Sequence, residues 1–441
     1  MIQTIKNAWK IPELRNKILF TIFALLIFRL GSAVPVPFVD TDLLGGYLDN
    51  MSGTIFGLMN AMSGGAFATA TVFALGVQPY INSSIIVQLL TVAIPALERL
   101  QKEGGEEGRK KIAAITRYVT VAIALLQGFG YYTLIRVNEL LALNGMNGIW
   151  AGIVIVLSFT AGSAFVMWLG EQITEFGIGN GISIILFAGI VSRVPSMLQT
   201  MWLGVNNSLN GISGEGVFAL PIWGAVLILL GMLILVVFIV FISNAERRLP
   251  VQYAKRMVGR KMYGGQSTHI PMKVNMSGVM PIIFAQSIAT LPTTIGAFAG
   301  WTVEDGGFVG GLMTVFDPSS LFYAVIYFFL ILGFSYFYAT MQFNPIEVAN
   351  NLKKNGGFIP GFRPGKPTAD FIQKVLGKIT LFGALYLSVI AIAPIVTQNI
   401  IGVRDLAIGG TSIIIVVSVA LETMKALEAQ MLMRHYKGFL E

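Results

Sequence analysis

Few side chains in this sequence could carry out catalysis, and those present do not form a catalytic pattern. The chain has no cysteine, so disulfides, thiolate metal sites and cysteine nucleophiles are excluded. Its two histidines, His269 and His435, are too few for a histidine-rich metal site. Ser213 in GISG is a candidate nucleophile, but the charge distribution described below places both histidines across the membrane from it, so it lacks a general base. No GxxxxGK[ST] phosphate loop is present. We therefore expect no enzymatic activity and no cofactor.

Neutral polar residues interrupt an apolar stretch at VQPYINSSIIVQ (77–88), where contact with lipid would leave their hydrogen-bonding groups unsatisfied. Helical spacing places Ile81 and Ile85 on one face, with Gln78, Asn82 and Gln88 beside them. Similar faces occur in three later segments, at Ile182 and Leu186 in GNGISIIL, at Ile283 and Gln286 in NMSGVMPIIFAQS, and at Ile415 in GGTSIIIV. A pore wall that is alternately wet and packed fits this pattern, and ordinary packing between helices fits it equally well.

The elements that must position these residues are membrane-spanning helices. The 441 residues are 55% hydrophobic and only 12% charged, with a mean hydropathy of +0.73, whereas soluble domains are roughly 25% charged. Apolar runs of about 20 residues, long enough to cross the hydrocarbon core, recur along the whole chain. The sequence predicts an all-α polytopic membrane protein with ten spans, near residues 18–37, 68–97, 113–135, 150–170, 181–198, 218–243, 276–298, 321–341, 375–398 and 408–427.

Basic residues indicate the orientation of the spans. Outside the spans, twenty-three Lys and Arg residues lie in the N-terminus, the C-terminal tail and the loops after even-numbered spans, against two in the other loops, Arg136 and Arg404. By the positive-inside rule, both termini are cytoplasmic. Five spans in each half permit an inverted repeat, with the working site between the halves. We expect an N-terminal half at 18–198, a C-terminal half at 199–427 and a cytoplasmic tail at 428–441.

Three segments outside the spans are predicted to have structure or partners of their own. Residues 1–17 begin with an amphipathic pattern typical of a helix on the membrane surface, with a disordered basic tail as the alternative. Residues 244–275 and 342–374 are long, basic loops. The first is expected to form a hairpin from the strands PVQYAKR and THIPMKVN, with the turn at MYGG. Such loops can serve only to fix topology, but their length and ordered patterning favour docking of an anionic partner.

Four long, ungapped motifs in this sequence resemble the SecY family of bacterial protein-conducting channel subunits. They are FALGVQPYINSSIIVQLL, MWLGEQITEFGIGNGISIIL, YGGQSTHIPMKVNMSGVMP and NPIEVANNLKKNGGFIPGFRPGKPTADFI. The resemblance extends over essentially the whole chain, and the bacterial form of the family matches better than the archaeal form. It implies a clamshell of two inverted five-helix halves around an hourglass-shaped pore. Unfolded secretory polypeptides would cross the membrane through this pore, and helices of membrane proteins would leave it laterally.

The resemblance also implies roles for particular residues. An aliphatic pore ring would seal the waist, with Leu186 at a position where the bacterial pattern usually has Ile; its members are Ile81, Ile85, Ile182, Leu186, Ile283 and Ile415. A short plug helix is implied at about 54–68, where the Gly and Ala content suits a loosely held segment. A lateral gate is implied between spans 2–3 and 7–8, where Gln88, Gln127 and Gln286 would pair when the gate is shut.

The chain has no nucleotide-binding phosphate loop, which agrees with a partner protein supplying the energy for transport. The resemblance implies that the motor ATPase SecA and the ribosome dock on the two basic loops, at Arg260, Lys261, Arg363, Pro364 and Gly365. It also implies the subunits SecE and SecG, signal peptides, nascent polypeptides and membrane lipids as partners, and a location in the bacterial cytoplasmic membrane. The main rival class is a secondary transporter of a small solute, which the scarcity of charge at the membrane midplane disfavours. An intramembrane enzyme is disfavoured by the position of the histidines.

Overall fold

The computed structural model describes most of the chain. The described residues are 2–50, 59–60, 62–102, 104–142, 148–210, 220–253, 256–258, 261–263, 267–276, 278–299, 301, 307–317, 320–401 and 410–437. The helices of the first half are α1 Ile2–Trp9, α2 Pro12–Gly31, α3 Thr41–Asn50, α5 Gln78–Ala93, α6 Pro95–Lys102, α7 Gly105–Val137, α8 Gly148–Phe176, α9 Gly181–Val191 and α10 Val194–Leu209. Those of the second half are α11 Ile222–Asn244, α12 Met280–Ala289, α13 Leu291–Ala299, α14 Gly307–Val315, α15 Leu321–Gln342, α16 Pro345–Lys354, α17 Lys366–Ile401 and α18 Gly410–Lys437.

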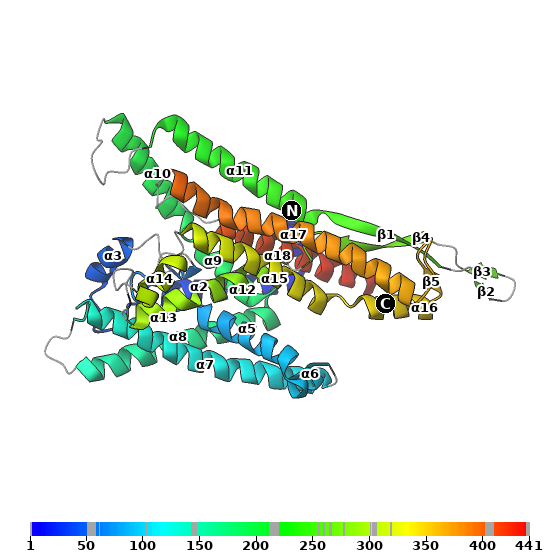
Figure 1. The fold of residues 1–441 in the computed structure, drawn as a ribbon, viewed down its shortest axis with the longest axis horizontal. Helices are drawn as coiled ribbons and strands as arrows, with labels where there is room; N and C mark the ends of the chain where they lie inside the picture. Colours follow the sequence, from blue (N-terminus) through cyan, green and yellow to red (C-terminus); the bar gives the residue numbers. More distant parts are fainter. Residues whose placement is uncertain are drawn as a thin grey trace.

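The long helices lie side by side along the long axis of the molecule, and a β-hairpin extends beyond one end of this bundle (Figure 1). Helices α6 and α16 lie toward the same end as the hairpin, and α3 lies at the opposite end. The strands are β1 Glu246–Tyr253, β2 Arg256–Val258, β3 Lys261–Tyr263, β4 Ser267–Lys273 and β5 Gly357–Phe358. The end that carries the hairpin therefore also carries both of the long basic loops expected from the sequence.

The predicted spans coincide with helices, although several boundaries differ. By length and hydropathy, the described part of the chain contains six helices able to cross a membrane, or seven if the bent pair α5–α6 counts as one span. The other three predicted spans coincide with α2, with the pair α12–α13 and with α18. These three are interrupted or carry charges near their ends, for example Glu13 and Arg29 in α2 and Lys425 in α18. Helix α17 begins nine residues before its predicted span, and α18 extends through most of the predicted C-terminal tail.

The second predicted span, 68–97, is much shorter in the structure. Turns occupy the residues before Gln78, and among them Gly64, Gly65 and Gly76 have positive φ, which favours glycine. Helix α5 begins with Pro79 in its first turn, where the missing N–H costs no hydrogen bond. It ends at Ile94, whose extended backbone is the conformation that the following proline favours. Helix α6 then departs at an angle of 105° to α5.

The two basic loops fold together into one unit outside the bundle. Strand β1 pairs antiparallel with β4 from the same loop and with β5 from the other loop. Seven buried apolar side chains from both loops and from the start of α17 form the core of this unit, namely Leu249, Val251, Met272, Leu352, Ile359, Ile372 and Leu376. The hairpin itself differs from the prediction, because Met262 and Tyr263 of the expected turn lie in β3, where they pair with Met257 and Arg256 of β2.

The N-terminal helix α1 packs against other parts of the chain, and its predicted position on the membrane surface stays a prediction. Its Ala8 is fully buried, in a small cluster with Leu14, Ile178 and Leu427. The hydroxyl of Thr4 donates a hydrogen bond of 3.3 Å to Glu428 in α18. The apolar side of this segment is therefore covered in part by α2, by Ile178 and by Leu427 of α18.

Candidate pore and docking sites

The residues of the predicted pore ring lie on four helices that share one large apolar cluster. They belong to or pack against one apolar cluster, with Ile81 and Ile85 on α5, Ile182 and Leu186 on α9, Ile283 on α12, and Ile415 on α18. All are buried except Ile182, which is partly buried. The i, i+4 spacing inferred from the sequence explains why both members of each pair on α5 and α9 face the same way.

A cavity of about 380 Å³ lies on one side of these residues. Four ring residues line it, Ile81, Ile182, Leu186 and Ile283, together with polar side chains that include Ser84, Gln88, Arg117, Glu171, Glu175 and Asn180. Asn180 caps α9, its side chain accepting hydrogen bonds from the backbone N–H groups of Ile182 and Ser183. This cap fixes the start of the helix that carries two ring residues. The lining of the cavity is thus mixed, with charged and amide side chains beside the aliphatic ring residues and aromatic side chains such as Phe284 and Tyr338.

The segment before α5 lies beside Leu186 of the ring. A small void of about 10 Å³ there is bordered by Met59 and Met62 of the predicted plug, by Gln78, and by Leu186. Leu186 therefore borders both this void and the large cavity. Residues 54–58 and 61 of the predicted plug lie outside the described residues.

The C-terminal end of the predicted plug is tightly packed, which differs from the expectation of a loosely held segment. The Phe67 ring is buried and stacks on Tyr131 of α7 with 4.4 Å between the ring centroids. The Tyr131 hydroxyl donates a hydrogen bond of 2.5 Å to the carbonyl oxygen of Phe67. The Gly and Ala content of this stretch suggested weak attachment, but one aromatic residue among small ones is enough to anchor it.

The three predicted gate glutamines lie on α5, α7 and α12, in the region where the two halves of the chain meet. Helix α5 contacts α12, and α7 contacts α13. Gln127 and Gln286 are buried, and Gln88 lines the cavity. The Oε1 atom of Gln127 is buried without a hydrogen-bond partner among the described residues. Pairing of these side chains in a closed gate stays a prediction.

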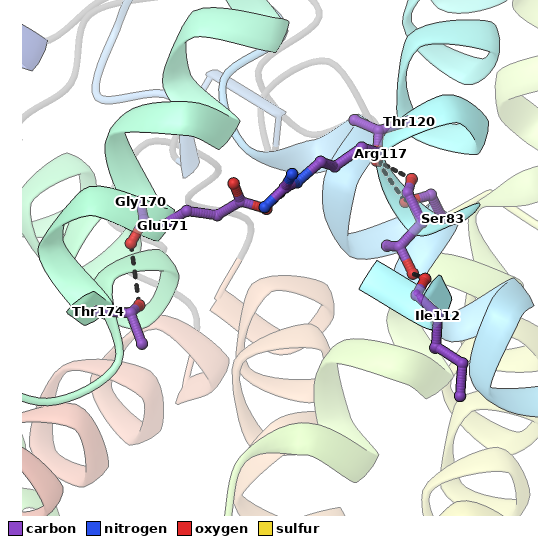
Figure 2. A network of polar contacts seen from close by, with 8 residues as sticks. Ser83, Ile112, Arg117, Thr120, Gly170, Glu171 and Thr174 are labelled. Atoms are coloured by element: carbon purple, nitrogen blue, oxygen red, sulfur yellow. Dashed lines mark hydrogen bonds and ion pairs between the residues drawn. The ribbon is translucent and has the colours of Figure 1, made fainter. Parts of the chain in front are cut away.

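A polar network that the sequence did not reveal links α5, α7 and α8 (Figure 2). The hydroxyl of Ser83 lies 2.5 Å from that of Thr120 and 3.2 Å from the carbonyl oxygen of Thr116. Thr116, Thr120 and Arg117 all lie on α7, and Arg117 forms an ion pair with Glu171 of α8, with 2.8 Å between Nε and Oε1. The only sequence signal for this network was the presence of polar residues at helix positions expected to be apolar. Their partners could not be assigned from that signal.

The predicted docking residues lie in the unit formed by the two basic loops. Arg363 and Pro364 are exposed in a turn flanked by Gly361 and Gly365, whose φ values are +88° and +107°. The hydroxyl of Thr368 donates a hydrogen bond of 2.7 Å to the carbonyl oxygen of Arg363 and so closes the turn.

Of the remaining two docking residues, the structure describes only Lys261. Lys261 begins β3, opposite Val258 of β2. Arg260 lies outside the described residues. The hairpin lies at the same end of the molecule as α16 and β5 (Figure 1), and the Arg363 turn lies in the chain between β5 and α17.

Comparison with known proteins agrees with this architecture. The sequence model of the SecY family matches residues 71–424. The protein translocase subunit SecY of Streptomyces coelicolor is 45% identical over 450 residues, covering 100% of both chains. The corresponding subunit of Corynebacterium glutamicum is 43% identical over 457 residues, again covering 100% of both chains.

Solved structures show the same fold at low sequence identity. A protein-conducting channel shares 17% identity, with a TM-score of 0.63 over 94% of this chain and 92% of that chain. Sec61 in the canine ribosome-channel complex shares 16% identity, with a TM-score of 0.60 over the same shares of the two chains.

These matches confirm the predicted fold class, a mostly helical multi-span membrane protein whose ten-helix clamshell is that of the SecY channels. They also confirm the predicted activity over the rival of a small-solute transporter, since the relatives are full-length translocase subunits. The chain belongs to the SecY family, the non-enzymatic protein-conducting channel subunits of the Sec translocase.

Proposed function

We propose that the six aliphatic side chains Ile81, Ile85, Ile182, Leu186, Ile283 and Ile415 form the seal of this channel. The observation that carries the proposal is the position of Leu186, which borders both the large cavity and the small void beside the plug segment. An aliphatic constriction of this kind closes to ions by excluding water. Flexible aliphatic groups can also fit around any polypeptide that passes, because they make no sequence-specific hydrogen bonds.

The large cavity would then be the cytoplasmic entrance of the pore, and the plug segment would lie on its outer side. This orientation follows from the excess of basic residues in the loops at the hairpin end, which places both termini in the cytoplasm. Translocating chains would enter through the cavity, and hydrophobic segments would leave between α5–α7 and α12–α15. The membrane in question is the bacterial cytoplasmic membrane, as the bacterial origin of the relatives supports.

The unit formed by the two basic loops is proposed as the docking site for SecA and for the ribosome, with SecE and SecG as membrane partners. The guanidinium of Arg363 is exposed and makes no hydrogen bond or ion pair within the described part of the chain. The turn that presents it is held by glycines and by Thr368 instead. An exposed cation on an independently closed turn suits an anionic partner. SecE and SecG should copurify with the chain after mild solubilisation, and recovery of the chain alone would contradict this assignment.

The seal is tested by placing a polar side chain in the ring. Ile85→Asn and Ile415→Asn should each admit water and increase the resting ion conductance of the channel in planar bilayers. Ile414→Asn is the matched control, because Ile414 is buried beside Ile415 but outside the ring. It should lower stability without a comparable increase in conductance. Unchanged conductance in both ring variants, or an equal increase in the control, would refute the seal.

A further inference from the structure

Ser83 lies on the side of α5 opposite to the two ring residues of that helix. Successive residues of an α-helix are separated by about 100° around the axis, so residues two positions apart lie about 160° from each other. Ile81 and Ile85 are both two positions from Ser83. When these isoleucines face the pore, the Ser83 hydroxyl necessarily points toward α7.

The hydroxyl of Ser83 is fully buried and has two partners on α7. It lies 2.5 Å from the hydroxyl of Thr120 and 3.2 Å from the carbonyl oxygen of Thr116. Thr120, which is also fully buried, donates a hydrogen bond of 2.7 Å to the same carbonyl oxygen. One consistent arrangement has Ser83 donating to Thr120 and Thr120 donating to Thr116. Both hydroxyl protons then have an acceptor, as buried hydroxyl groups require.

This arrangement restricts the rotation of α5 more than apolar packing would. Aliphatic contacts are non-directional, so a helix that packs only through them can turn slightly at little cost. A hydroxyl pair is directional, and turning α5 would break the bond between the two helices. Each hydroxyl would keep only a carbonyl oxygen of its own helix, that of Tyr80 for Ser83 and that of Thr116 for Thr120. The polar pair thus selects one orientation of the helix.

Helix contacts continue from α7 through α8 to the second pair of ring residues, on α9. Arg117 of α7 is paired with Glu171 of α8 (Figure 2). The neighbouring Gly170 of α8 lies so close to α9 that an added Cβ would be 2.4 Å from the Cδ1 atom of Ile182. The two helices that bring ring residues from the N-terminal half are therefore connected through α7 and α8.

We propose that Ser83 and Thr120 are positioning residues for the pore seal: their hydroxyl pair fixes the rotation of α5 so that Ile81 and Ile85 face the pore. The inference rests on the proposed role of the ring as the seal. It assigns to two hydroxyl groups, which contact neither the cavity nor the translocating chain, a direct influence on closure.

The test separates the hydroxyl of Thr120 from its volume. Thr120→Val keeps the shape and removes the hydroxyl, whereas Thr120→Ser keeps the hydroxyl and removes a methyl group. We expect Thr120→Val and Ser83→Ala to raise resting conductance about threefold, the change in an equilibrium constant that corresponds to an average hydrogen bond between membrane helices. Thr120→Ser should retain the conductance of the parent. The double variant Ser83→Ala/Thr120→Val should leak no more than the leakier single variant, because both changes remove one shared bond.

Thr133→Val is the matched control on the same helix, since the Thr133 hydroxyl bonds only to the Phe129 carbonyl of its own helix. It should leave conductance unchanged. Parent-like conductance in Thr120→Val and Ser83→Ala, beside a leaking Ile85→Asn variant, would overturn the positioning role and leave the seal intact. A leak in Thr120→Ser equal to that in Thr120→Val would show that packing and not the hydroxyl matters, and would overturn it too. An Ile85→Asn variant that does not leak would instead remove the seal on which the inference rests.

Discussion

Gly181, the first residue of α9, lies directly against the backbone of Gly170 in α8. A Cβ atom at position 181 would be 2.0 Å from the carbonyl oxygen of Gly170, a separation that requires the backbone to move. The next residue along the chain is Ile182, so the close approach of these two helices also sets the position of the ring residues on α9.

Gly181→Ala should therefore destabilise the protein, by about 1–3 kcal/mol as for other overpacked interiors. It should also displace Ile182 and Leu186 and increase resting conductance. Thermal unfolding in detergent and bilayer conductance measure the two effects. Gly231→Ala in α11 is the control, because no heavy atom lies within 4 Å of its added Cβ. If both variants melted at the temperature of the parent, the close approach of α8 and α9 would not matter.

Phe67→Ala should cost on the order of 3 kcal/mol, since it removes a buried ring and leaves a cavity beside Tyr131. Phe129→Ala is the comparison, because the Phe129 side chain is exposed on the same helix as Tyr131. Chemical denaturation followed by tyrosine fluorescence would compare the two. The same contact makes a prediction for deletions of the plug segment. A deletion that includes Phe67 should impair folding, whereas a deletion that ends before Ser63 should mainly increase ion leak. Equal stability of the two alanine variants would contradict this division.

Val251→Asp should loosen both basic loops together. Val251 is fully buried on β1, the strand that pairs with β4 and β5, and a carboxylate there would lack a partner. Limited proteolysis should then cut both 244–275 and 342–374 faster than in the parent. Gln252→Asp introduces the same group at an exposed neighbouring position and should leave both rates nearly unchanged. Faster cleavage of only the first loop would mean that the two loops are independent.

Arg363→Glu should abolish SecA-driven translocation into inverted vesicles while leaving membrane insertion and SecE association unchanged. Reversing the charge of a desolvated interfacial contact costs about 2–5 kcal/mol. Arg363→Lys should be impaired as well, because an ammonium group cannot form the paired hydrogen bonds of a guanidinium. Thr368→Val distinguishes docking from support of the turn, since it removes the bond to the Arg363 carbonyl and keeps the cation. Normal transport by the Glu variant would exclude Arg363 from docking.

The sequence by itself determined the properties that depend on local pattern. Hydropathy identified the spans because each must be apolar along its own length, and the distribution of Lys and Arg gave a consistent orientation. The i, i+4 spacing identified which residues of α5 and α9 share a face, because helical periodicity is a property of adjacent turns. Long motifs then identified the family, which the comparisons confirmed.

Only the tertiary structure decided which faces meet. The bond between Ser83 and Thr120 joins residues 37 positions apart, and that between Thr4 and Glu428 joins residues 424 positions apart. The burial of Phe67 against Tyr131 and the pairing of β1 with β5 are likewise contacts between distant segments. A local sequence pattern indicates that a side chain needs a partner, but it does not identify the partner, because several helices offer compatible apolar faces. The choice among them follows from packing of the whole chain, which brings Gly181 against the backbone of Gly170 and the Ser83 hydroxyl against that of Thr120.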